Sequence, residues 1–148
     1  MSRITTKFSA LKRAGRKGFI PFVTAGDPDI ETSTAVVLAL AELGADVIEI
    51  GVPFSDPMAD GPTIQASSQR ALENRADLPQ VLSMTAKIRN ETDVPIILFS
   101  YFNPLFRYGL EKLAIDARIA GVDGILVTDV VDGEADKLRS ILDPKEID

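Results

Sequence analysis

The chain has 148 residues, of which 45% are hydrophobic and 26% are charged, as in an ordinary globular domain that buries a sizeable core. It contains no cysteine and no histidine, which excludes disulfides, thiolate nucleophiles and imidazole acid–base chemistry. A formal net charge of −6 argues against a nucleic-acid partner, and no apolar run is long enough to cross a membrane, so we expect a cytoplasmic protein.

The N-terminal segment is basic. Six of its first 17 residues are Lys or Arg, namely Arg3, Lys7, Lys12, Arg13, Arg16 and Lys17. Such a cluster can bind a polyanion, but it is more often the solvated face of a surface helix. We favour the second interpretation.

Strand-like and helix-like patterns alternate through the rest of the chain. Apolar, largely β-branched runs cover residues 19–25, 46–52, 95–102 and 124–130. The segments between them carry apolar residues at the spacing of an α-helix, as in Val81, Met84 and Ile88. This βαβαβαβα order predicts an α/β fold with a parallel sheet, either doubly wound or closed into a (β/α)₈ barrel.

Short signals mark where the helices begin and end. Asp27–Pro28 and Gly61–Pro62 each place a capping residue before a proline, which favours a helix start. Gly44 and Gly121 precede strand-like runs and are typical of helix ends.

Three acidic residues stand out in the run 46–52 and in the loop that follows it. Strand alternation places Glu49 on the face opposite Ile48 and Ile50, and its apolar surroundings should raise its pKa. Asp56 and Asp60 lie in a loop rich in proline and glycine. From the residues alone, Glu49 could equally be neutralised by an arginine or by backbone donors, and both aspartates could be turn or capping residues.

The sequence IEIGVPFSDPMADGPTIQ (residues 48–65) resembles a signature of the tryptophan synthase α subunit family. The segments FIPFVTAGDPD (residues 19–29) and YFNPLFRYG (residues 101–109) resemble the regions around that family's first and third strands. The resemblance implies a (β/α)₈ TIM barrel. Because such a barrel needs roughly 250 residues, we expect residues 1–148 to form a single partial domain, a half barrel with four βα units and without strands 5–8.

The resemblance also implies an enzyme, a lyase of tryptophan biosynthesis. Its reaction is the retro-aldol cleavage of indole-3-glycerol phosphate to indole and glyceraldehyde 3-phosphate, with no cofactor or metal in this chain. Glu49 matches the family's catalytic acid–base, and Asp60 matches its catalytic aspartate, which would bind the indole N–H. Substrate-binding positions of the family are matched by Phe22, Tyr101 and Asp129.

The family's partner is a pyridoxal-phosphate-dependent β subunit, with which the resemblance implies an α₂β₂ tetramer. Four residues match the region that faces this partner: Pro53, Asp56, Asn103 and Pro104. The family binds the substrate phosphate with residues of its C-terminal half, so we expect the 148 residues alone to be inactive. An alternative is a truncated, non-catalytic fragment that binds the β subunit. Another phosphate-sugar barrel would share the fold but not the PFSDPMADGP signature.

Overall fold

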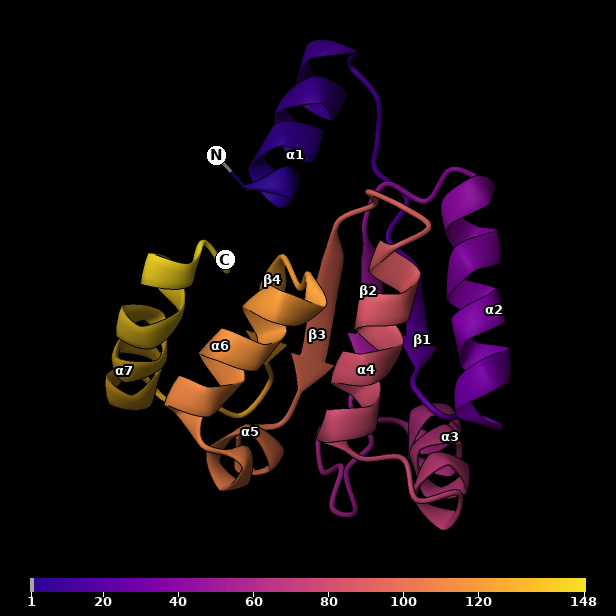
Figure 1. Cartoon of the computed structure of the whole chain (residues 1–148), viewed down its shortest axis with the longest axis vertical. Coiled ribbons are helices and arrows are strands. Elements are labelled where there is room, and N and C mark those ends of the chain that lie inside the picture. Colours follow the sequence, from indigo (N-terminus) through magenta and orange to yellow (C-terminus); the bar gives the residue numbers. More distant parts are fainter. Residues whose placement is uncertain (1) are drawn as a thin grey trace.

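The computed structural model describes residues 2–148 and contains one parallel sheet (Figure 1). Its strands are β1 (Phe22–Thr24), β2 (Ile48–Gly51), β3 (Ile96–Ser100) and β4 (Gly124–Val127), paired in chain order. Helices α2 (Ile30–Glu42), α4 (Leu78–Arg89) and α6 (Leu110–Ala120) lie in front of it, and α7 (Asp132–Leu142) and the 3₁₀ turn η1 (Asp143–Lys145) follow. The predicted parallel α/β order is confirmed. Within residues 2–148, no helix is both long and apolar enough to cross a membrane.

The core lies between the sheet and these helices. Ile50 of β2 and Leu98 of β3 are fully buried, and they belong to one cluster with Val81, Met84 and Ile88 of α4, which are fully buried too. Burying one such side chain contributes about 1.5–3 kcal/mol. The helical spacing in the sequence therefore identified the face of α4 that packs on the sheet.

The regular strands are shorter than the apolar runs that predicted them. Pro21 and Pro95 stand just before β1 and β3, and proline has no N–H to give to a sheet. Their carbonyl groups still accept hydrogen bonds, from the N–H of Glu49 and of Ile48, each at 2.9 Å. The runs thus include the entry to each strand as well as the strand itself.

The helix start predicted at Asp27 is wrong. α2 begins after Asp29, whose carboxylate accepts a hydrogen bond from the N–H of Thr32 at 2.6 Å. The carboxylate of Asp27 instead binds Arg70 of α3 (Pro62–Glu73) through two hydrogen bonds of 2.7 and 2.8 Å. An ion pair between two segments has replaced the local cap that the sequence pattern indicated.

The other signals for helix ends are confirmed. Gly61 precedes α3, with Pro62 at its first position. Gly121 ends α6 with a φ of +81°, and Gly44 follows α2 with a φ of +92°. Both values lie in the left-handed region, where glycine is favoured because it lacks a Cβ.

The two ends of the sheet are built differently. In Figure 1, α1 (Arg3–Arg13) lies at the end where the strands begin, and α3 and α5 (Phe102–Tyr108) lie at the end where they finish. The segments that follow the strands therefore gather at their carboxyl ends. Folds of parallel βα units place their functional residues at this edge.

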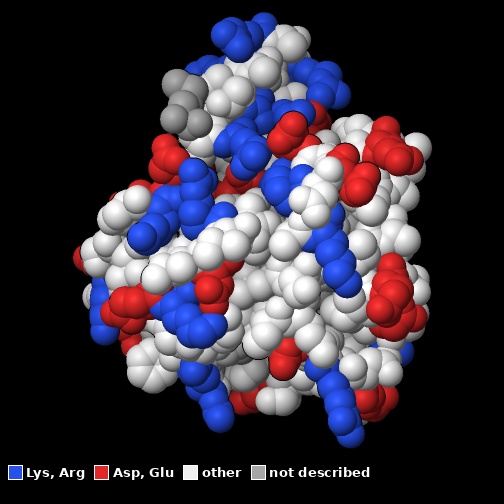
Figure 2. Space-filling model, in the orientation of Figure 1, with Lys and Arg blue, Asp and Glu red and all other residues white. Residues whose placement is uncertain are grey.

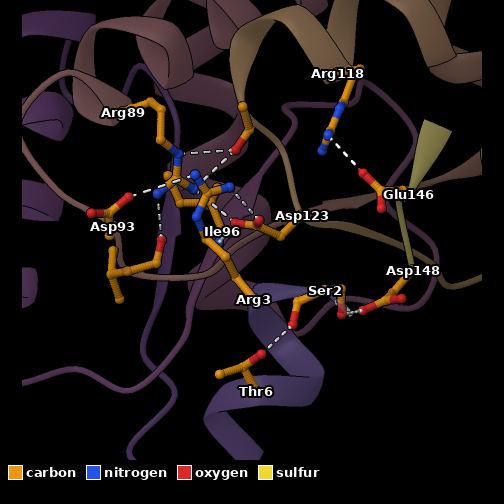
Figure 3. Close-up of polar contacts among 12 residues, drawn as sticks. Ser2, Arg3, Thr6, Arg89, Asp93, Ile96, Arg118, Asp123, Glu146 and Asp148 are labelled. Carbon is orange, nitrogen blue, oxygen red and sulfur yellow. Dashed lines mark hydrogen bonds and ion pairs between the residues drawn. The ribbon is translucent and has the colours of Figure 1, made fainter.

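Ion pairs hold α1 against the opposite edge. Asp46 and Asp123 are almost fully buried there. Asp46 pairs with Lys7 at 3.6 Å and with Arg16 at 2.6 Å, and Asp123 pairs with Arg3 at 3.0 Å (Figure 3). Lys and Arg side chains gather over α1 at the top of Figure 2. The basic segment is largely exposed, as predicted, and three of its six basic residues also pair with buried acids.

Candidate active site

The face of the sheet that points away from α2, α4 and α6 is the more open one. The strand register aligns Phe22, Glu49, Ile97 and Gly124, so their side-chain positions share this face. Phe22, Glu49 and Ile97 are only partly buried, and Leu126 is 38% exposed. We call this surface the open face. It is where a dissolved molecule can reach the strands.

Glu49 places an ionisable group in the middle of the open face. Its neighbours along β2, Ile48 and Ile50, point to the opposite side and are fully buried. Burial raises the pKa of Glu49, in the direction that the sequence predicted. Among residues 2–148, no hydrogen bond or ion pair reaches its carboxyl group, and burial is the one influence on its pKa. The alternative explanation of Glu49, a neutralising arginine or backbone donors, therefore has no counterpart in the part of the chain described.

Aromatic rings lie beside this carboxyl group. Phe22 is its partner in the neighbouring strand, and the rings of Phe22 and Phe99 meet edge to face with centroids 5.4 Å apart. A Cβ on Gly51 would come within 2.4 Å of the Phe22 ring. The missing side chain at Gly51 therefore leaves room for the Phe22 ring against β2, near Glu49.

The loop after β2 brings Asp60 to the carboxyl edge of the sheet. Asp60 is partly buried, and its N–H donates to the carbonyl of Pro57 at 3.1 Å. Its own carbonyl accepts a hydrogen bond from the Gln65 side chain of α3 at 2.8 Å. These contacts fix its backbone and do not involve its carboxylate.

Tyr101 lies between the loop and the sheet. It is 3% exposed, its ring is 5.2 Å from that of Phe54, and its hydroxyl accepts a hydrogen bond from the N–H of Ala59 at 2.9 Å. Burial raises the pKa of Tyr101, and the negative charges of Asp60 and Asp129 act in the same direction. The structure therefore gathers Tyr101, Asp60 and Asp129 at one end of the sheet.

The remaining predicted residues lie at the same edge in different surroundings. Asp129 is exposed, and its carboxylate accepts a hydrogen bond from the N–H of Phe102 at 2.6 Å. Asp56 and Asn103 are exposed and Pro104 is partly buried, whereas Pro53 is buried within the chain. The substrate-binding and interface roles of these residues stay predictions.

Sequence reasoning missed three residues that shape this site. The contact of Gly51 with Phe22 was not foreseen, although glycine inside a strand often marks a close approach. Phe99 was treated only as part of an apolar run, and alternation from Tyr101 would have placed it on the open face. No sequence signal identified Phe54, because its contact with Tyr101 spans two separate loops.

Comparisons with known proteins identify a family and similar structures for this chain. The family model described as tryptophan synthase alpha chain matches residues 8–148. A tryptophan synthase alpha chain from Citrifermentans bemidjiense is 53% identical over all of this chain and 55% of its own length. Tryptophan synthase subunit alpha from Legionella pneumophila has a TM-score of 0.96 and 38% identity, over 99% of this chain and 56% of that chain.

A third similar structure is an assembly, a tryptophan synthase complex from Pyrococcus furiosus. It has a TM-score of 0.84 and 42% identity, over 88% of this chain and 53% of that chain. The chain thus spans about half the length of the relatives that it matches.

Proposed function

Since the chain belongs to the tryptophan synthase alpha chain family, we propose that it carries the carboxyl groups that cleave indole-3-glycerol phosphate to indole and glyceraldehyde 3-phosphate. The observation that carries this proposal is Glu49. Its carboxyl group has no partner among residues 2–148, lies on the open face with a pKa raised by burial, and has an aromatic ring in the adjacent strand.

Glu49 is suited to the proton transfers of this reaction. The carbon–carbon bond breaks when C3 of the indole ring gains a proton and the hydroxyl group on C3′ of the side chain loses one, which leaves indole and an aldehyde. The two transfers balance, so no oxidant or reductant is needed. A raised pKa lets one carboxyl group act both as acid and as base near neutral pH.

Asp60 is suited to a different task, which is to stabilise charge on the substrate. Positive charge develops on the indole nitrogen when C3 is protonated, and a carboxylate that accepts a hydrogen bond from the indole N–H stabilises that charge. Its place in the loop at the carboxyl edge supports this role. Phe22 and Phe99 would supply the apolar wall for the indole ring.

The experiment is indole release from indole-3-glycerol phosphate, with the β subunit present. Because relatives are longer than this chain, the remaining C-terminal segment of the Citrifermentans bemidjiense relative is added as a separate polypeptide. We expect release with this segment and none without it, because the open face alone leaves Glu49 in contact with water. Glu49→Gln should abolish release, and Glu31→Gln, at an exposed position of α2, should not. Equal release by the wild-type chain and Glu49→Gln would refute the proposal.

A second candidate function is binding of a β subunit without catalysis. Met58 and Phe106 are 77% and 60% exposed and lie on segments at the carboxyl edge, and exposed apolar side chains are typical of contact surfaces. The similar Pyrococcus furiosus structure is of a complex. An α₂β₂ assembly, with pyridoxal phosphate only in the β subunit, completes this proposal.

Sedimentation with the β subunit tests the contact surface. Met58→Asp should weaken the complex, whereas Leu43→Asp should not, because Leu43 is 83% exposed but follows α2 at the opposite edge of the sheet. Binding without indole release, even with the complementing segment, would favour this second function over catalysis. No binding would remove it.

A further inference from the structure

We propose that Tyr101 is a positioning residue, whose hydroxyl group holds the loop after β2 and thereby sets the place of the Asp60 carboxylate. The inference rests on the proposed function for the role of Asp60. It differs from the role in the substrate pocket that the sequence resemblance implies for Tyr101. The loop concerned is residues 53–60, and we call it the Asp60 loop.

The Asp60 loop is attached to the rest of the chain at few points. Within residues 2–148, two hydrogen bonds join it to other segments: from the Ala59 N–H to the Tyr101 hydroxyl at 2.9 Å, and from the Gln65 side chain to the Asp60 carbonyl at 2.8 Å. Its other hydrogen bonds are internal, such as that from the Met58 N–H to the Asp56 carbonyl. A loop with so few attachments depends strongly on each of them.

Tyr101 contacts this loop with both parts of its side chain. The ring packs against Phe54 near the start of the loop, and the hydroxyl binds the backbone of Ala59 near its end. Tyr101 follows β3 directly and is 3% exposed, so the sheet and the surrounding side chains hold its ring in place. One rigid side chain thus spans the loop from one end to the other.

The hydroxyl group still has a proton to give. A tyrosine hydroxyl can accept one hydrogen bond and donate another, and the bond from Ala59 uses only an acceptor position. Asp60 is the next residue, and its negative charge, with that of Asp129, helps to raise the pKa of Tyr101. The negative charge of Asp60 therefore acts on the phenol, and the proposed bond runs from the free O–H of Tyr101 to the Asp60 carboxylate.

Amide hydrogen exchange measured by NMR on the 148-residue chain tests the first half of the proposal. Tyr101→Phe keeps the ring and removes only the hydroxyl, so exchange at Ala59 should become about fivefold faster, the change expected for loss of one neutral hydrogen bond. Tyr108→Phe is the matched control, because the Tyr108 hydroxyl binds Asp116 and Lys112 instead. Unchanged exchange at Ala59 in Tyr101→Phe would overturn the proposal.

A spectroscopic titration tests the coupling between Tyr101 and Asp60. The chain has two tyrosines and no tryptophan, so in a Tyr108→Phe background the absorbance of tyrosinate reports Tyr101 alone. Asp60→Asn should move this titration to lower pH, and Asp56→Asn should leave it in place. Equal shifts from both variants would contradict the coupling.

Amide exchange and the tyrosine titration together distinguish loss of the proposed contact from unfolding of the variant. If Tyr101→Phe unfolds the chain, amide exchange becomes faster in α4 as well as in the Asp60 loop. The titration then tests the proposal, because its variants keep Tyr101. Neither readout needs indole release. Failure of the proposed lyase activity would therefore leave both results interpretable, and failure of the positioning role would leave the activity assay unaffected.

Discussion

Arg89 is the side chain whose removal should most weaken the edge where the strands begin. It extends from α4, is 13% exposed, and makes five hydrogen bonds (Figure 3). One joins the Asp123 carboxylate at 2.7 Å, and the others reach backbone carbonyls of Thr92, Val94 and Gly121. It therefore ties the end of α4 to the starts of β3 and β4.

The expected cost of Arg89→Met follows from what it leaves behind. Methionine keeps the apolar stem, so the loss is electrostatic. Removing one member of a buried ion pair costs about 3–5 kcal/mol. Asp123 keeps Arg3 at 3.0 Å and the N–H of Ile96 at 2.9 Å, so we expect the lower end, about 3 kcal/mol. For a domain of this size that lowers the melting temperature by about 10 °C.

Urea and thermal unfolding measure this loss against a matched control. Arg118→Met removes another arginine that pairs with an acid, but Arg118 and Glu146 are about half and two-thirds exposed, so its cost should stay below about 0.5 kcal/mol. The double variant Arg89→Met with Asp123→Asn should cost less than the sum of the two single variants, because the two side chains interact. A loss below about 1 kcal/mol in Arg89→Met, or strict additivity, would refute the reasoning.

Three further predictions concern the site and its supports. Gly51→Ala should destabilise the chain by about 1 kcal/mol in urea, because its Cβ displaces the Phe22 ring, and near-ultraviolet dichroism should report the lost ring packing. Glu49→Gln should be more stable than the wild-type chain at pH 8 and equal to it below pH 4: a carboxyl group whose pKa is raised on folding disfavours the folded state increasingly as pH rises. Thr24→Val should cost about 1 kcal/mol in the same assay, because the buried hydroxyls of Thr24 and Ser67 are hydrogen-bonded at 2.8 Å.

The sequence predicted those features that depend on local periodicity. Alternation along residues 46–52 assigned Glu49 to the open face, and helical spacing identified the buried face of α4 through Val81, Met84 and Ile88. Both patterns arise because one side of an element faces the core. The sequence alone therefore shows which side of a strand or helix faces the core, even when the elements that pack against it are unknown.

Features that depend on pairs distant in sequence could not be predicted in this way. The cap assigned to Asp27 failed because Arg70, 43 residues away, takes its carboxylate. The contact of Tyr101 with Ala59 spans 42 residues and joins two loops, whose lengths and turns set the distance. From the sequence, Asp27 could equally be a helix cap and Tyr101 a plain core aromatic residue. Only the folded structure shows the distant partner that each side chain contacts.

The two edges of the sheet differ in how many of their polar side chains are paired. Where the strands begin, buried Asp46 and Asp123 each pair with two cationic side chains, so the stability of this edge depends on several ion pairs. Where the strands end, the Asp60 loop depends on Tyr101 and Gln65, and the carboxyl group of Glu49 has no partner among residues 2–148. Under the proposed function, Glu49 must stay without an internal partner so that it can exchange protons with a substrate, and its burial then disfavours the folded state as pH rises. The dense ion pairs at the opposite edge offset that cost at a distance from the reacting atoms, so substitutions there should change unfolding without changing exchange at Ala59.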